Sequence, residues 1–277
     1  MSTISASEVN KLRQMTGAGL MDCKKALQET NGDFEAAVDF LRKRGAKIAA
    51  KRADREATEG AVIAVTSADN KTGVIILLSC ETDFVAKNEG FVAFANEIAQ
   101  VALAEKPATI DALKALQVGS VALESRLLEE VAKIGEKIDV VQYELIEGEN
   151  LVAYIHGSNR MGVLVEMNLA PSEANFAAGK DVAMQIAAMN PVAVDKDGVD
   201  TTIVEREMEI GREQARAEGK PEAMIDRIAT GKLEKFYKES TLLNQDFVKD
   251  SSKSVSAMLN GIESGLTVKQ FKRVQLG

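Results

Sequence analysis

The spacing of apolar residues changes sharply near residue 80, and this change predicts a strand followed by a helix. Residues 74–78 (VIILL) form a continuous apolar run, long enough for a buried strand, which residues 79–82 (SCET) bring to an end. Apolar residues then recur at the helical positions Phe91, Phe94, Ala95 and Ile98. Asp83 and Phe84 therefore fall at a strand-to-helix junction.

Asp83 and Phe84 admit two interpretations. In one, Phe84 packs into its own core and Asp83 caps the following helix. In the other, the junction holds both side chains out toward a partner, as loops at element ends often do. The pattern around them favours neither interpretation.

An internal repeat bears on this choice. Two apolar segments return about 89 positions later, and a helical pattern follows each pair. The four segments are residues 61–65 (AVIAV), 73–77 (GVIIL), 151–155 (LVAYI) and 162–165 (GVLV). The second copy has residues 171–173 (PSE) where the first has residues 82–84 (TDF), so the scaffold does not require Asp-Phe. This asymmetry favours a functional role.

The first 55 residues predict three short helices. Residues 5–8 (SASE) have the form of a capping box, and Gly17 interrupts the first apolar face. A second helix is expected over residues 21–29, and Asp33 can cap a third that continues to Gly45.

Two charge-rich segments predict further helices. Residues 48–59 are basic and rich in alanine, which is typical of a helical linker with a solvated basic stripe. Residues 199–237 predict two antiparallel helices in a protruding coiled-coil hairpin, with a turn at residues 219–221 (GKP). A helix over residues 123–135 and a strand over residues 266–274 complete the pattern.

These elements predict an α+β protein with more than one core, because 277 residues exceed the size at which a single core keeps growing. The expected domains are a three-helix bundle with its basic linker (1–55), a first antiparallel-sheet-plus-helix subdomain (56–144) and a related second subdomain (145–277). The helical hairpin (199–237) interrupts the second subdomain.

Charge and hydropathy exclude several classes of function. Residues 1–55 hold 11 Lys and Arg against 7 Asp and Glu, which leaves 23 against 35 for the remainder. This acidic bulk argues against direct nucleic-acid binding and favours a protein partner. No apolar run approaches the roughly 20 residues of a membrane span, and the N-terminal residues resemble no targeting segment. A cytoplasmic location without membrane attachment is expected.

Candidate chemistry is sparse. Cys23 and Cys80 have mostly apolar neighbours and are expected to be buried thiols, and a single histidine makes a zinc cluster or a Ser-His-Asp set difficult to build. The Gly-Ala-Gly of residues 17–19 follows no strand and precedes no Gly-Lys-Ser/Thr, so a turn is favoured over a phosphate loop. We expect no metal, no cofactor and no catalytic residue. A GTPase or kinase is disfavoured.

Two motifs carry a resemblance to a known family. Residues 16–27 (TGAGLMDCKKAL) and 82–88 (TDFVAKN), in this order, are similar to those of translation elongation factor Ts, and the similarity extends over almost the whole chain. That family is the guanine-nucleotide exchange factor of elongation factor Tu. The resemblance implies this partner, exchange without covalent chemistry, a bundle of the ubiquitin-associated type and a hairpin that can serve self-association.

The resemblance also implies which residues meet the partner. Those associated with binding and with displacement of Mg²⁺ are Thr82, Asp83, Phe84 and Val85, with His156 as a further contact. Those in the N-terminal bundle are Arg13, Leu20 and Met21. The alternative function is a non-catalytic module that uses the ubiquitin-associated-like bundle to hold a protein without promoting exchange.

Overall fold

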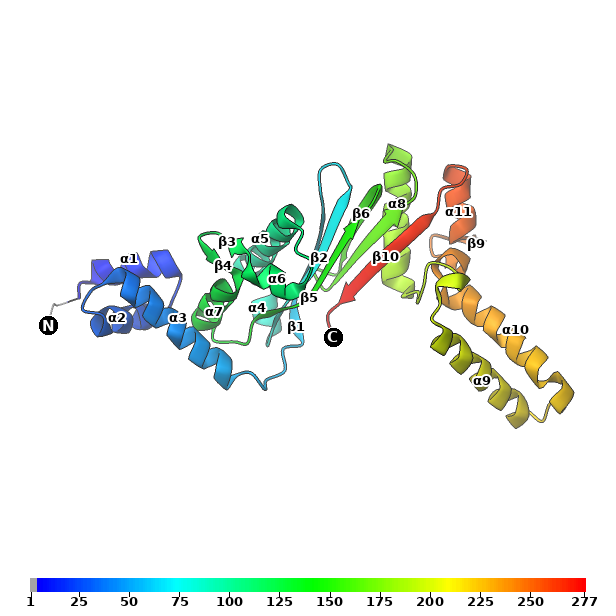
Figure 1. Ribbon diagram of the computed structural model, residues 1–277, viewed down its shortest axis with the longest axis horizontal. Helices are drawn as coiled ribbons and strands as arrows, with labels where there is room; N and C mark the ends of the chain where they lie inside the picture. The colour runs from blue at the N-terminus through cyan, green and yellow to red at the C-terminus, as the bar shows by residue number, and fades with distance from the viewer. Residues whose placement is uncertain (1–3) are drawn as a thin grey trace. The chain divides into compact units, whose positions relative to one another are not determined.

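The computed structural model describes residues 4–277 and confirms the α+β class. The chain divides into two compact units (Figure 1). The first holds the residues up to 63 with residues 74–145 and 274–277, and the second holds residues 64–73 and 146–273. Two three-stranded sheets have the strand orders β1-β2-β5 and β10-β7-β6.

Three helices open the first unit. They are α1 (Ala6–Thr16), α2 (Leu20–Glu29) and α3 (Phe34–Lys51). The expected capping box is present, because the Ser5 side chain accepts from the Glu8 N–H while the Glu8 carboxylate accepts from the Ser5 N–H. Gly17 ends α1 in the left-handed conformation that glycine adopts without strain (φ 66°).

Helix α3 corrects the expectation of a separate helical linker. It continues past Gly45 to Lys51, so the first part of residues 48–59 belongs to the bundle and only a short turn remains before the sheet. Gly45 lies inside α3, where its lack of a side chain permits close contact with helix α7 (Leu123–Ile134). A Cβ atom at Gly45 would lie 2.2 Å from the backbone oxygen of Leu128 in α7.

The first sheet places its buried strand at the centre. The apolar run expected over residues 74–78 lies in β2 (Thr72–Cys80), all nine residues of which are buried. The remaining elements of this region are β1 (Glu59–Thr66), α4 (Asp83–Ala86), α5 (Glu89–Glu105), α6 (Ile110–Ala115), β3 (Gln117–Val118), β4 (Val121–Ala122) and β5 (Asp139–Glu147).

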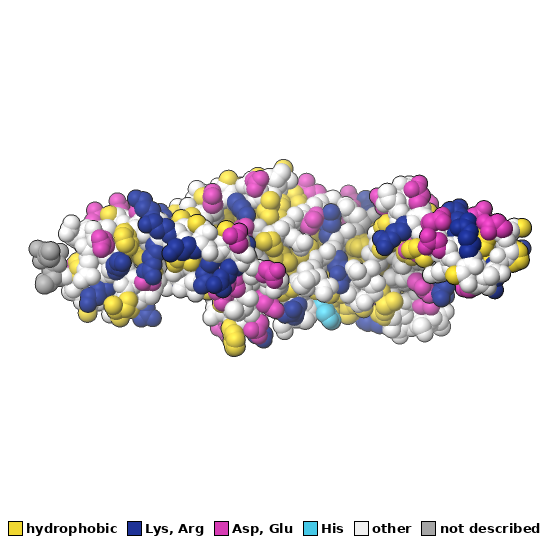
Figure 2. Space-filling model, turned by 90° about the horizontal axis from the view of Figure 1, so that it is seen from below, with side chains coloured by type: hydrophobic (Ala, Val, Ile, Leu, Met, Phe, Trp, Pro, Cys, Tyr) yellow, Lys and Arg dark blue, Asp and Glu magenta, His cyan; other side chains and the backbone are white. Residues whose placement is uncertain are grey.

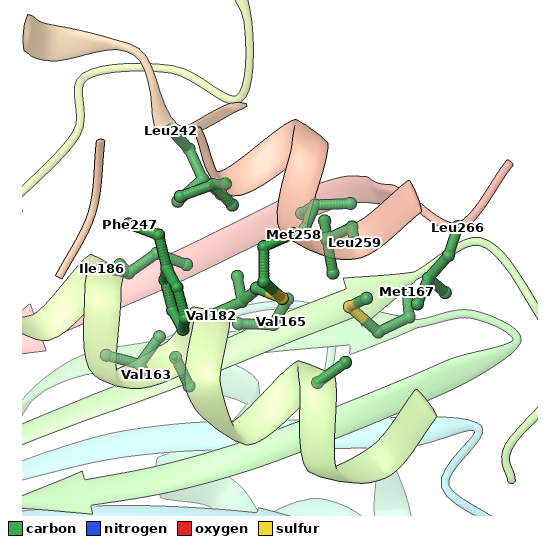
Figure 3. Close-up of a cluster of buried hydrophobic side chains, with 14 of the residues drawn as sticks. Val163, Val165, Met167, Val182, Ile186, Leu242, Phe247, Met258, Leu259 and Leu266 are labelled. Atoms are coloured by element: carbon green, nitrogen blue, oxygen red, sulfur yellow. The ribbon is translucent and has the colours of Figure 1, made fainter. Parts of the chain in front are cut away.

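The second sheet and its helices enclose the apolar core shown in Figure 3. Strands β6 (Asn150–His156) and β7 (Met161–Met167) pair antiparallel from Asn150↔Met167 to His156↔Met161. In the core, Val163 and Val165 meet Val182 and Ile186 of α8 (Glu173–Met189). The other elements are η1 (Lys196–Gly198), η2 (Leu242–Asn244), β8 (Asp246–Phe247), β9 (Asp250–Ser254), α11 (Val255–Ile262) and β10 (Val268–Gln275).

Helices α9 (Thr201–Ala217) and α10 (Glu222–Ser240) form the expected antiparallel pair around a turn at residues 218–221. Gly211 has no side chain, which lets the two helices approach closely: a Cβ atom there would lie 3.0 Å from the Ala229 Cα. Acidic and basic side chains are interspersed over this hairpin (Figure 2), and Arg212 is ion-paired with Asp226 across it at 2.8 Å. Over residues 4–277, no helix is long and apolar enough to cross a membrane.

Gly45 gives a stability test of the α3–α7 contact. We expect Gly45→Ala to lower the free energy of unfolding by about 1–3 kcal/mol, because the added methyl group would push against backbone rather than a flexible side chain. Gly231→Ala in α10 is the matched control, since its Cβ meets nothing within 4 Å and alanine favours a helix. Urea denaturation of both variants measures the difference, and equal stability would contradict the close contact.

Candidate functional site

Residues 82–85 form a short, exposed turn of helix directly after the buried strand β2. Thr82 is the N-cap of α4, and its hydroxyl accepts from the Val85 N–H at 3.4 Å. Phe84 is 84 % exposed, so the interpretation in which it packs into its own core is wrong. The cap is Thr82 rather than Asp83, while Asp83 and Val85 are half-buried. We call residues 82–85 the tip.

The exposure of Phe84 is specific to its position. Phe91 and Phe94, in the first two turns of α5, are only 2 % and 4 % exposed. Their buried side chains pack α5 against the protein. Asn88 separates the two environments, because its side chain caps α5 by accepting from the N–H of Gly90 and Phe91. An apolar core is therefore available a few residues away, yet the tip directs its aromatic side chain into solvent.

Glu136 supports the base of the tip. One carboxylate oxygen accepts from the backbone N–H of Glu81 and of Thr82, both at 3.0 Å, and the other accepts from the Thr82 hydroxyl at 2.6 Å. Glu136 follows Gly135, which ends α7 in the left-handed conformation (φ 81°). Hydrogen bonds to a charged acceptor are the stronger ones, so these three contacts hold the start of the tip firmly.

Glu81 is a second, half-buried carboxylate at the base of the tip. Its oxygens accept from Arg52 at 2.7 Å each and from the backbone N–H of Lys137 at 2.7 Å, and Arg55 lies 3.7 Å away. Burial raises the pKa of Glu81, but the hydrogen bonds from Lys137 and Arg52 outweigh it and leave the pKa below its ordinary value. The basic stripe expected to be solvated is thus partly ion-paired, because Arg52 binds this carboxylate.

Asp83 carries the charge of the tip. Its carboxylate accepts from Lys87 at 2.6 Å, one helical turn away, and this hydrogen bond holds the pKa of Asp83 below its ordinary value. Lys87 is exposed and Asp83 only half-buried, so the net contribution of this surface pair to stability is small. Asp83 is therefore ionised at neutral pH, and among the described residues its side chain pairs with the long, exposed side chain of Lys87.

The N-terminal bundle exposes two of its three expected contact residues strongly. Leu20 and Met21 begin α2 and are 49 % and 70 % exposed, while the arginine expected beside them, Arg13, is exposed on the last part of α1. Met15 is a further exposed methionine on α1 that the sequence analysis did not select. Behind these residues, Cys23 and Leu27 are fully buried in the bundle core.

His156 lies in the second compact unit, at the exposed end of β6. Its Nδ1 atom is 2.9 Å from the Tyr154 hydroxyl, and the two ring centroids are 5.9 Å apart. The next three residues, Gly157 to Asn159, all adopt positive φ angles and reverse the chain into β7. The structure thus brings together the four residues of the tip, and it places His156 in a separate unit at a hairpin end.

Both cysteines are buried and free, as the sequence predicts. Burial raises the pKa of Cys23, and it raises the pKa of Cys80 to about 12, so neither thiol is reactive at neutral pH. Among the described residues, no group of three or more His, Cys, Asp or Glu side chains is arranged to hold a metal ion.

The comparison with protein families covers most of the chain. The model of the family described as "Elongation factor TS" matches residues 81–277, a match that begins at the carboxylate beneath the tip. The chain belongs to the elongation factor Ts family. This membership makes it a translation elongation factor by family.

Relatives of the same name match over their full length. The elongation factor Ts of Cytophaga hutchinsonii is 54 % identical over 277 residues and covers 100 % of both chains. That of Amoebophilus asiaticus is 53 % identical over 274 residues, with 99 % of each chain covered, and that of Chlorobaculum tepidum is 45 % identical over 288 residues, with 100 % of each covered.

The acidic support of the tip is what the sequence analysis missed. Glu136 lies 54 positions from Thr82, and no local pattern links the two residues. The only sequence signal was Gly135 at the end of the predicted helix over residues 123–135, which indicates that the next residue leaves the helix axis. Glu81 was visible beside the tip motif, but the partner that fixes it was assigned to a solvated stripe.

The Arg52–Glu81 pair predicts a pH-dependent loss of stability. At pH 7 we expect Arg52→Gln to lower the free energy of unfolding by about 1 kcal/mol, a value typical of a partly exposed ion pair. Because the folded pKa of Glu81 is depressed, its stabilising effect is present above the unfolded pKa of about 4.3 and is lost as the pH falls through the folded value.

Urea titrations at pH 7 and near pH 3 measure this effect. Arg55→Gln is the control, because Arg55 is farther from Glu81 and more exposed. A deficit of the same size at both pH values would contradict an electrostatic origin.

Proposed function

We propose that this chain is the guanine-nucleotide exchange factor of elongation factor Tu. It binds the GDP complex, displaces Mg²⁺ and opens the nucleotide site, so that GDP leaves and GTP can bind during protein synthesis. The observation that carries this proposal is the exposed Phe84 on a turn fixed from below, within the motif that the family resemblance associates with exchange.

Exchange requires no covalent chemistry. A factor that binds the nucleotide-free GTPase more tightly than the loaded one weakens nucleotide binding by the same factor, because the coupling of two ligands is reciprocal. The tip needs only to make contacts that exist in the open state and not in the closed one. A rigid apolar wedge next to a carboxylate fits this requirement.

Phe84 and Asp83 have different roles in this proposal. Phe84 inserts as an apolar wedge into the partner and shifts an element that holds the nucleotide. Asp83 brings a negative charge toward the Mg²⁺ site, where Mg²⁺ demands a near-octahedral shell and links the phosphates to the GTPase. Thr82 and Val85 hold the backbone of the turn, because the Thr82 hydroxyl caps it by accepting from the Val85 N–H.

The other proposed contacts surround this centre. Arg13, Leu20 and Met21 form a contact surface of the ubiquitin-associated-like bundle, and exposed apolar side chains suit such a surface. His156 adds a contact from the second unit. The α9–α10 hairpin, with its charged faces, serves self-association, and the domain division is that given above: 1–55, 56–144 and 145–277.

Removing the wedge tests this function. We expect Phe84→Ala to slow catalysed GDP release from elongation factor Tu by about tenfold or more, the size expected for loss of a buried aromatic contact in the complex. Its free energy of unfolding should change by no more than about 0.5 kcal/mol, because the side chain is 84 % exposed. Stopped-flow release of a fluorescent GDP measures the rate.

Ile262→Ala is the matched control, because it removes another exposed apolar side chain from a helix end. It should leave release unchanged. A Phe84→Ala variant that exchanges normally would remove the wedge from the mechanism. Binding of the wild-type chain without accelerated release would favour the non-catalytic binding module instead.

The bundle surface has its own test. Met21→Asp places a charge in a proposed apolar contact, so the binding free energy for elongation factor Tu should weaken by about 2 kcal/mol or more. Met15→Asp is the control, since it changes the same residue type at another exposed position of the bundle. Titration calorimetry measures both, and equal losses would show that the effect does not depend on the Met21 surface.

A further inference from the structure

We propose that Glu136 is a positioning residue for nucleotide exchange: its carboxylate sets the direction in which the tip presents Phe84. This role rests on the proposed function, since it concerns the residue that orients the wedge. Glu136 itself does not belong to the tip, and it acts only through the backbone and hydroxyl of the residues before Phe84.

Apart from Glu136, the tip is held mainly by local contacts, such as the Cys80 thiol that donates to the Thr82 carbonyl oxygen at 3.3 Å. Helix α4 has four residues, none of them fully buried, so apolar packing holds it only weakly. A single helical turn is not stable by itself, because its one or two internal hydrogen bonds do not offset the cost of ordering the backbone. The hydrogen bonds at its N-terminal end must therefore supply the order.

Glu136 supplies that order through Thr82. The Thr82 hydroxyl donates to Glu136 at 2.6 Å, which directs its oxygen lone pairs toward the Val85 N–H that it caps at 3.4 Å. The carboxylate at the same time accepts the two consecutive backbone N–H groups before α4. Loss of the Glu136 carboxylate would leave the backbone N–H groups of Glu81 and Thr82 without an acceptor. The Thr82 hydroxyl, which caps the turn, would lose its acceptor as well.

The support is reciprocal. The side chain of Glu136 accepts from the backbone of residues 81 and 82, while the side chain of Glu81 accepts from the backbone N–H of Lys137. Lys137 in turn donates through its Nζ atom to the backbone oxygens of Ala53 and Arg55, at 2.6 and 3.0 Å. The loop after α7 is thus bound to the base of the tip and to the chain that leaves the bundle.

Helix α7 consequently supports both proposed contact surfaces. Its backbone at Leu128 receives α3 of the bundle at Gly45, and the residue after its C-cap holds the tip. A change at Glu136 should disturb the tip and leave the α3–α7 contact, which lies two turns earlier in α7, intact.

Two variants and one control test the proposal. Glu136→Ala removes all three acceptor contacts, and Glu136→Gln keeps one acceptor oxygen for the backbone N–H groups. Glu166→Ala is the matched control. Glu166 is a buried carboxylate in the second unit that accepts from Lys269 at 3.1 Å and from Gln270 at 2.8 Å, far along the sequence from the tip.

The first measurement is amide hydrogen exchange of the free protein, which does not depend on any partner. In Glu136→Ala we expect residues 81–88 to exchange at least about tenfold faster, while β2 and α5 keep their protection. Glu136→Gln should recover most of the protection. Unchanged protection of residues 81–88 in Glu136→Ala would overturn the support that we assign to this carboxylate.

The second measurement is fluorescent GDP release from elongation factor Tu over a range of factor concentrations. Glu136→Ala should lower the maximal rate by about tenfold or more and change the half-saturating concentration by much less, because the bundle surface still binds. Glu166→Ala should lower stability without lowering the maximal rate. A loosened tip with a normal maximal rate, or an equal loss of rate in Glu166→Ala, would overturn the positioning role.

These outcomes separate the inference from the function on which it rests. If Phe84→Ala exchanges normally, the wedge is wrong, whereas the hydrogen-exchange result still decides whether Glu136 orders the tip. If Phe84→Ala is slow and Glu136→Ala is not, the wedge stands and the positioning role fails.

Discussion

Reciprocal hydrogen bonding between residues 81–82 and residues 136–137 holds the tip in place. Glu136 accepts from the backbone of residues 81 and 82, and Glu81 accepts from the backbone of Lys137 and from Arg52. Both carboxylates are half-buried, so leaving either charge without partners would carry a desolvation cost. The same bonds that satisfy the two charges therefore fix the turn that carries Phe84.

The same hydrogen bonds keep the turn ordered although its aromatic side chain, Phe84, is exposed. Burial of a phenylalanine stabilises a protein by about 1.5–3 kcal/mol, and Phe84 forgoes that gain while Phe91 and Phe94 obtain it nearby. A rigid wedge loses little conformational freedom when it enters a partner, so more of its contact energy remains for binding. Order at the tip is thus useful even though the tip contributes little to the core.

The sequence predicted what depends on local periodicity. The VIILL run became the buried strand β2, the capping box started α1, and Asp83 and Phe84 fell at the expected strand-to-helix junction, because burial and capping follow short-range patterns. The same pattern did not decide whether Phe84 is exposed. Long-range pairing was not predictable in this way. The partner of Thr82 lies 54 positions away, and the partner of Glu81 lies in a basic segment that resembled a solvated helix.

The central claim is that the tip opens a nucleotide site held by Mg²⁺. Stopped-flow release of a fluorescent GDP from elongation factor Tu, measured with and without this chain in Mg²⁺ and in EDTA, tests it most directly. The account predicts accelerated release in both buffers, with a larger fold-acceleration in Mg²⁺, because EDTA already removes the ion that Asp83 is proposed to displace. No acceleration, or the same fold-acceleration in both buffers, would contradict it.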